Sequence, residues 1–367
     1  MSGKIRRRIV LVTSGLGTLH GGIGVVSHSI LRALRADHDV DVWLHPVALP
    51  RPLRIGFLAA RALLGSLHAP DFIFYEHVHL AALHRTLPSL QKVPYGVFLH
   101  GIEVWQPLVG RRREALVNAN ILVANSATTV TMAREVNRWL PEVKVTWLGV
   151  TVGDPAVCPG ELPPTATIVG RMASLERLKG HDAVLDAWPA IRRAVPDAHL
   201  VIVGTGNDRL RLEARVRQEN LPGVEFRGRL SDAERDRIYQ TSRLFFFPSK
   251  GEGFGLAGVE AAGWGVPLLG LRGTVMDELF PNGCAIFAGD VSAGAIADAA
   301  IPVLRDSQLA NTVGRSGRQR VRQTFLEEHF LARFRAALEP LPEGQPVSGN
   351  FPSSNSPSFR AGHRTPT

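Results

Sequence analysis

Short apolar runs rich in valine, isoleucine and phenylalanine alternate along this chain with longer segments of helical periodicity. Such alternation is typical of parallel βαβ units, in which each buried strand is followed by a helix that covers the sheet. In the first half we expect strands at residues 8–13, 39–45, 71–76, 95–100, 120–124 and 143–148. In the second half we expect strands at residues 166–171, 199–203, 224–227, 243–248, 267–271 and 284–288. Each half therefore predicts a doubly wound α/β domain.

A turn-rich stretch separates the two halves. Residues 153–164 contain four prolines and two glycines, a composition that neither a helix interior nor a central strand tolerates. We therefore expect one domain over residues 1–155 and a second over residues 156–340, and 367 residues suffice for two cores. Residues 341–367 are dominated by proline, serine, glycine and asparagine, which predicts a disordered tail.

Composition excludes several classes of protein. Only Cys158 and Cys284 are present, too few for a disulfide framework or a cysteine-based metal site. No stretch reaches the roughly 18 to 20 apolar residues of a membrane span, and the run after Arg8 is too short for a signal peptide. We therefore expect a cytoplasmic protein.

The net charge is positive and unevenly distributed. Residues 1–155 contain 17 basic and 10 acidic residues, which accounts for +7 of the total of +9. This surplus favours phosphate-bearing or anionic-surface partners. Nucleic acid is a remote alternative, because the sequence shows no basic stripe interleaved with aromatic residues and has only three tyrosines.

Two segments of the first half follow expected strands and have the composition of ligand-binding loops. Ligands of open α/β sheets bind at the carboxyl ends of the strands. Five glycines, among them Gly21 and Gly22, separate the first strand from a helix expected near Val25, and they allow backbone amides to approach a phosphate. His100 leaves the fourth strand before Gly101, where it can hydrogen-bond a substrate or shuttle a proton. A plain connecting loop and a structural histidine are the alternatives.

The second half carries the stronger motifs. Arg171 at a strand end and Lys179 before the next helix can converge on one anion, although two solvated loop cations are the alternative. Glu252 lies on a glycine-rich turn after Pro248, and Glu260 lies eight positions later in a helix expected from Leu256. This spacing predicts that the two carboxylates contact different parts of one extended ligand.

These segments together resemble the retaining glycosyltransferases of family 4, the group 1 glycosyltransferases with the GT-B fold. The resemblance rests on the Gly21-Gly22 loop, His100-Gly101, Arg171 with Lys179-Gly180, and above all Glu252-Gly253-Phe254-Gly255 with Glu260, in this order over roughly residues 8–335. It implies two Rossmann-like domains facing across a cleft. The first domain would bind the acceptor and the second the nucleotide sugar, and the last helices of this family often cross back.

The resemblance also implies roles for single residues. Gly21 or Gly22 would present amides to the donor diphosphate, which Arg171 and Lys179 would stabilise as it departs. His100 would hydrogen-bond the transferred sugar.

The remaining roles concern the sugar and the nucleoside. Glu252, with the amides of Phe254 and Gly255, would hold sugar hydroxyls, and Gly253 completes that turn. Glu260 would hold the ribose, and Gly228-Arg229-Leu230 resembles the segment that lines the base pocket. The family often has Pro-Asn-Gly-Val where this chain has Trp147-Leu148-Gly149-Val150, so we expect no contact from that asparagine.

No metal or other cofactor is expected. Asp39-Val40-Asp41 matches the pattern of metal-dependent transferases, but the residues straddle a strand start. His77-x-His79, with His68 and His84 nearby, lacks a helical histidine pair with a carboxylate.

The predicted function is hexose transfer from a GDP- or UDP-linked sugar to a glycan or lipid-linked acceptor in bacterial surface polysaccharide or glycolipid assembly. A nucleotide-sugar epimerase or a sugar phosphorylase of the same fold is the alternative.

Residues 51–67 have apolar side chains at helical spacing, which fits a helix packed on its sheet or an interfacial helix. The basic clusters at residues 6–8 and 111–113 would assist binding to the inner face of an anionic membrane.

Overall fold

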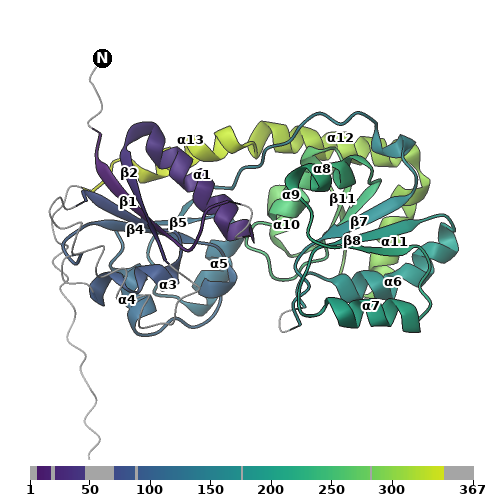
Figure 1. The fold of residues 1–367 in the computed structure, drawn as a ribbon, viewed down its shortest axis with the longest axis horizontal. Coiled ribbons are helices and arrows are strands. Elements are labelled where there is room, and N and C mark those ends of the chain that lie inside the picture. Colours follow the sequence, from purple (N-terminus) through teal and green to yellow (C-terminus); the bar gives the residue numbers. More distant parts are fainter. Residues whose placement is uncertain are drawn as a thin grey trace, which may run out of the picture.

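The computed structural model describes residues 6–17, 21–45, 70–86, 90–174, 177–281 and 283–342. Two parallel six-stranded sheets lie in two lobes side by side, with helices on both faces of each sheet (Figure 1). The expected α/β class with two doubly wound sheets is confirmed. Residues 51–67 and the tail beyond residue 342 lie outside the described residues.

The first sheet has the strand order β2-β1-β3-β4-β5-β6. Its strands are β1 (Arg8–Thr13), β2 (Asp39–Leu44), β3 (Phe72–Tyr75), β4 (Tyr95–Leu99), β5 (Ile121–Ala124) and β6 (Lys144–Val145). The expected positions are confirmed, although β6 is shorter than residues 143–148. The chain turns away after β6, because the amide of Val150 donates to the carbonyl of Phe325 (2.8 Å) instead of pairing in the sheet.

The second sheet has the order β12-β11-β10-β7-β8-β9. Its strands are β7 (Thr165–Val169), β8 (His199–Val203), β9 (Val224–Arg227), β10 (Leu244–Phe246), β11 (Leu268–Leu271) and β12 (Ile286–Ala288). The direction of winding reverses between β1 and β3 in the first sheet and between β7 and β10 in the second. Ligands of open α/β sheets bind at such reversals.

Helices connect the strands of both sheets. In the first lobe they are α1 (Gly21–Asp37), α3 (Val78–Ala81), α4 (Arg111–Val117) and α5 (Ala127–Val136), with 3-10 turns at His84–Thr86 and Ile102–Val104. In the second they are α6 (His181–Ala194), α7 (Arg209–Gln218), α8 (Asp232–Gln240), α9 (Leu256–Gly263), α10 (Val275–Leu279), α11 (Ala293–Arg305) and α12 (Ser307–Thr324).

The prediction that the first helix begins near Val25 was wrong by four residues, because α1 begins at Gly21. Packing of Val26 and Ile30 in the core stabilises the helix and overrides the low helix propensity of its glycine-rich first turn.

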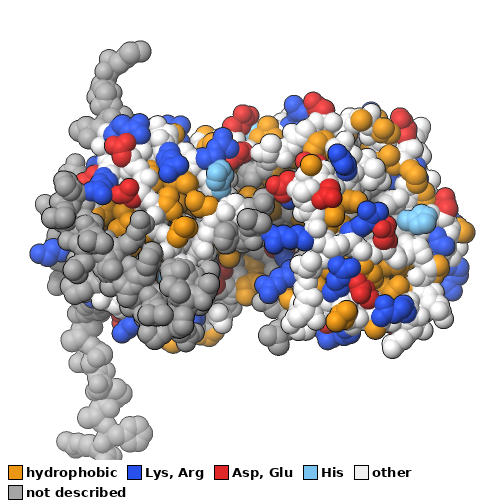
Figure 2. Space-filling model, viewed as in Figure 1, with side chains coloured by type: hydrophobic (Ala, Val, Ile, Leu, Met, Phe, Trp, Pro, Cys, Tyr) orange, Lys and Arg blue, Asp and Glu red, His pale blue; other side chains and the backbone are white. Residues whose placement is uncertain are grey.

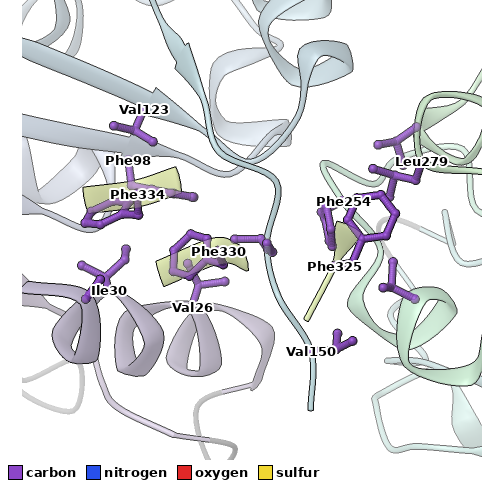
Figure 3. Packing of buried hydrophobic residues seen from close by; sticks show 14 of the residues in the cluster. Val26, Ile30, Phe98, Val123, Val150, Phe254, Leu279, Phe325, Phe330 and Phe334 are labelled. Atoms are coloured by element: carbon purple, nitrogen blue, oxygen red, sulfur yellow. The ribbon is translucent and has the colours of Figure 1, made fainter. Parts of the chain in front are cut away.

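The last helix, α13 (Glu327–Leu338), returns to the first lobe and packs along α1 (Figure 1). Phe334 of α13 is fully buried and meets Phe74 of β3 edge to face, with ring centroids 5.1 Å apart. Figure 3 shows Phe334 between Phe98 and Ile30. At the other end of the same core cluster, Phe325 packs against Phe254 of the second lobe. One apolar cluster therefore joins elements of both lobes.

The turn-rich stretch at residues 153–164 is not a free connection. It contains a 3-10 turn at Pro159–Glu161 that packs against α12. The amide of Gly160 donates to the side chain of Asn311 (2.7 Å), and Asp154 forms ion pairs with Arg318 and Arg322.

None of the helices in the described ranges combines the length and the hydropathy that a membrane crossing requires.

Candidate active site

A cavity of 460 Å³ lies between the carboxyl ends of the strands of the two sheets. Figure 2 shows Lys and Arg side chains on the edge of the second lobe that borders the space between the lobes. Of the residues predicted from the sequence, those that line the cavity are Gly21, Gly22, His100, Arg171, Lys179, Glu252 and Gly253. The others do not line it: Leu230, Phe254, Gly255 and Glu260.

On the second-lobe side, the ammonium of Lys179 forms an ion pair with the carboxylate of Glu252. The loop that precedes Lys179 is tied to the end of β10, because the amide of Lys250 donates to the carbonyl of Leu178 (3.0 Å). Arg171 follows β7 and is exposed at the cavity. Two cations from the loop after β7 and one carboxylate from the loop after β10 therefore line this wall.

Glu260 lies on α9, behind this wall. Its carboxylate accepts a hydrogen bond from the hydroxyl of Tyr239 (3.1 Å) and lies 3.4 Å from Nε of Arg235. Burial raises the pKa of Glu260, although Arg235 and Tyr239 oppose the shift. The side chain keeps 19% exposure, so a ligand hydroxyl can reach it.

The turn before α9 requires glycine at position 255. Gly255 has a φ of +86° and precedes the helix without a capping side chain. A Cβ there would lie 2.7 Å from the ring of Phe247 and 2.7 Å from Cε of Met276. The ring of Phe254 is buried against Phe325, so only its backbone is available to a ligand.

On the first-lobe side, His100 is held at both its backbone and its ring. Its amide donates to the carboxylate of Glu103 (2.5 Å), and Nε2 lies 2.8 Å from the carbonyl oxygen of Glu76. Because a carbonyl oxygen only accepts hydrogen bonds, Nε2 must carry the proton. In the neutral ring Nδ1 is then an acceptor, suited to a ligand hydroxyl.

Glu76, which the sequence analysis missed, is a buried carboxylate at the end of β3. It accepts hydrogen bonds from the hydroxyls of Thr13, Ser14 and Ser27 and from the amide of Ser14 (2.9 Å). These donors come from the end of β1 and from α1. Glu76 therefore fixes the start of the glycine-rich loop, while its backbone carbonyl orients His100.

Other lining residues missed in the sequence are Glu103, Arg177, His181, Asp182 and Asp208. Asp208 follows β8 through Gly204-Thr205-Gly206 and pairs with Arg211 (2.6 Å) and Arg177 (3.6 Å). The strand-end rule that identified Arg171 and His100 could also have found Asp208. His181 carried no comparable signal, because its burial at the cavity depends on the packing of α6.

The two lobes touch directly beside the cavity at the N-terminus of α5. The hydroxyl of Ser126 donates to the carbonyl of Gly253 in the second lobe (2.6 Å), and within the first lobe the side-chain amide of Asn125 donates to the carbonyl of His100 (2.7 Å). Glu278 of α10 accepts hydrogen bonds from the amides of Ala127 (2.9 Å) and Thr128 (2.7 Å). A carboxylate of one lobe thus caps a helix of the other.

We expect Glu278→Ala to favour separation of the lobes and to lower kcat/KM about tenfold. The hydrogen bonds to the charged carboxylate of Glu278 exist only while the lobes are in contact, so their loss destabilises only the closed arrangement. The measurements are small-angle scattering of the unliganded protein and initial rates of the sugar transfer that the sequence predicts. Asp277→Ala is the matched control, because Asp277 bonds Arg272 and the amide of Gly273 within its own lobe. Equal scattering and equal rates for both variants would contradict the capping role.

The candidate metal ligands have other partners. Asp39 and Asp41 lie at the start of β2 and pair with Arg6 and Arg8. Nδ1 of His84 lies 2.9 Å from the hydroxyl of Tyr75. Within the described ranges, no group of three or more His, Cys, Asp or Glu side chains has a metal-binding arrangement.

Part of this chain is similar in sequence to known glycosyltransferases. Residues 159–320 match the family described as Glycosyl transferases group 1. The chain is 24% identical over 241 residues to O-antigen chain mannosyltransferase C of Escherichia coli, which covers 63% of this chain and 62% of that protein. It is 30% identical over 173 residues to phosphatidyl-myo-inositol mannosyltransferase of Mycobacterium leprae, covering 44% and 43%. The chain thus spans less than two thirds of the length of these curated relatives.

Solved structures share the fold. Sucrose-phosphate synthase from Thermosynechococcus elongatus superposes with a TM-score of 0.75 at 19% identity, covering 90% of this chain and 97% of that one. HepE of Anabaena, solved with UDP and glucose, superposes with a TM-score of 0.74 at 16% identity, covering 92% and 100%. The expected GT-B architecture is confirmed.

Proposed function

We propose that this chain, whose residues 159–320 match the group 1 glycosyltransferases, transfers a hexose from a nucleotide sugar to a glycan or lipid-linked acceptor. The observation that carries the proposal is the cavity where Arg171, Lys179 and Glu252 face Gly21, Gly22 and His100. We assign the acceptor to residues 1–155 and the donor to residues 156–340. GDP and UDP both remain candidate carriers, because a relative from Corynebacterium glutamicum (28% identical) is named as GDP-mannose-dependent and HepE was solved with UDP.

The proposed reaction breaks the bond between the anomeric carbon and the diphosphate oxygen, and the electron pair leaves with the nucleoside diphosphate. Lys179 and Arg171 would stabilise the charge that develops on this leaving group, so the reaction as proposed requires no metal. The acceptor hydroxyl attacks from the same face and gives its proton to the departing phosphate oxygen. Retention of configuration is inferred from the resemblance to family 4.

The remaining residues would hold the donor. Nδ1 of His100 would accept a hydrogen bond from a hydroxyl of the transferred sugar, opposite Glu252. Glu252 pairs with Lys179 and would share that ammonium with the diphosphate. Glu260 would accept hydrogen bonds from the ribose hydroxyls, with Leu230 beside the base.

A lipid-linked acceptor is supported by one of the two basic clusters. Arg6 and Arg8 already pair with Asp39 and Asp41, so the cluster at residues 6–8 offers little free charge. The arginines at 111–113 are exposed on α4 and follow Val109, whose side chain is 75% exposed. This combination of cations and an apolar residue suits the surface of an anionic leaflet.

Thermal denaturation with a panel of UDP-, GDP- and ADP-sugars tests the proposal. A ligand present at 100 times its Kd adds about 2.7 kcal/mol to the free energy of unfolding, which raises Tm. One of these donors should raise the Tm of the wild type, and Glu260→Ala should reduce that shift because the ribose loses its acceptor. Glu225→Ala removes an exposed carboxylate of β9 and should keep the full shift. The absence of any shift in the wild type would contradict the proposed function.

A further inference from the structure

His181 is a buried histidine at the wall of the cavity. It is the first residue of α6, its side chain is 6% exposed, and it lines the cavity with Lys179 and Arg171. Its Nε2 atom is buried and has no hydrogen-bond partner among the described residues. Buried polar atoms almost always have a partner, so this nitrogen at the cavity wall lacks a partner that a bound ligand or water would supply.

The N-terminus of α6 adds donors at the same place. The helix has 14 residues and begins after Gly180, which has a left-handed backbone and supplies no capping side chain. The first hydrogen bond across the turn runs from the amide of Val184 to the carbonyl of Gly180 (3.1 Å). The carboxylate of Asp182 points away to Arg211 (2.6 Å) and does not cap the helix. The positive end of the helix is therefore left for an anion.

The charge state of His181 suits a hydrogen-bond donor. Burial lowers its pKa to about 4, with a further lowering by Lys179 that Asp182 and Asp208 oppose. The ring is therefore neutral near pH 7 and has one N–H group. Such a ring adds a directional donor beside Lys179 without adding another charge.

We propose that His181 is a further donor-binding residue, whose Nε2–H donates to a phosphate oxygen of the nucleoside diphosphate at the N-terminus of α6. The inference rests on the proposed function and extends its diphosphate site beyond Arg171 and Lys179. A phosphate oxygen fits better than a ribose hydroxyl, because Arg171 and Lys179 line the cavity with His181, while the carboxylates of Asp182 and Asp208 are paired with Arg211. Glu260, assigned to the ribose, does not line the cavity.

The test is the Kd of purified wild type and variants for UDP, GDP and ADP, each compared with its nucleoside. His181→Phe keeps a ring of similar size but has no donor, and we expect it to bind the preferred diphosphate at least about tenfold more weakly. Its affinity for the nucleoside should not change. His181→Gln places an amide nitrogen near the position of Nε2 and should recover most of the lost affinity.

His84 provides the matched control. It is also a buried histidine whose Nε2 has no partner among the described residues, but it does not line the cavity. We expect His84→Phe to bind the diphosphate as the wild type does. In addition, the ring ¹⁵N signals of His181 in the wild type should shift when the diphosphate is added, a readout that does not depend on how the variants fold.

Two results would overturn the inference. If His181→Phe bound the diphosphate as tightly as wild type, or lost affinity for nucleoside and diphosphate equally, His181 would not contact phosphate while the proposed function stood. If the wild type bound none of the three diphosphates, both the inference and the proposed function would fall.

Discussion

Lys179→Ala is expected to lower kcat for sugar transfer about 10²- to 10³-fold, the usual cost of removing one group that stabilises developing negative charge. The ammonium of Lys179 is the only charged partner of Glu252 among the ion pairs of the described residues, and it lies at the wall where the diphosphate would depart. Lys179→Arg should not restore the rate fully, because a planar guanidinium replaces a compact ammonium. The measurement is steady-state kinetics with the donor selected by thermal shift.

Lys250→Ala is the control for this experiment. Lys250 is exposed, follows β10 two residues before Glu252 and does not line the cavity. We expect its kcat to match that of the wild type. A rise in KM for Lys179→Ala without a fall in kcat would show that Lys179 binds the donor but does not stabilise the transition state.

Phe334→Ala is expected to lower the free energy of unfolding by about 3–5 kcal/mol, the usual cost of removing a fully buried aromatic ring. Phe334 contacts Phe74, Phe98 and Phe330, and no part of its side chain is exposed. Phe334→Leu keeps much of the volume and should cost far less. Urea denaturation measures the difference.

The same substitution should release α13 from the first lobe. Hydrogen exchange should become faster in α13 and in α1, which α13 contacts, while α6 and α11 of the second lobe keep their protection. Equal acceleration in all four helices would contradict a local role of Phe334 and indicate that the whole chain unfolds as one unit.

The strand positions could be predicted from the sequence because burial on both faces of a parallel sheet leaves apolar runs such as Ile9–Val12. The start of α1 could not be predicted, because the contacts of Val26 and Ile30 outweigh local glycine propensity. The site was partly predictable for a similar reason. His100, Arg171 and Glu252 follow strands, and the carboxyl ends of parallel strands meet at one edge.

Residues whose role depends on contacts distant in sequence escaped prediction. Glu76 ends an expected strand, but its role becomes evident only when the fold brings Thr13, Ser14 and Ser27 around its carboxylate. Glu278 caps a helix that begins about 150 positions earlier in the chain. No local pattern encodes either contact.

The sequence by itself determined the two α/β halves, the ends of their strands and the residue types suited to phosphate and sugar at those ends. These properties depend on periodicity and on turn chemistry, which act over a few residues. Only the tertiary structure decided that Lys179 meets Glu252, that Ser126 reaches Gly253 and that α13 packs on α1. Those contacts depend on strand order and on how the two lobes pack, which are set by the burial of the whole chain.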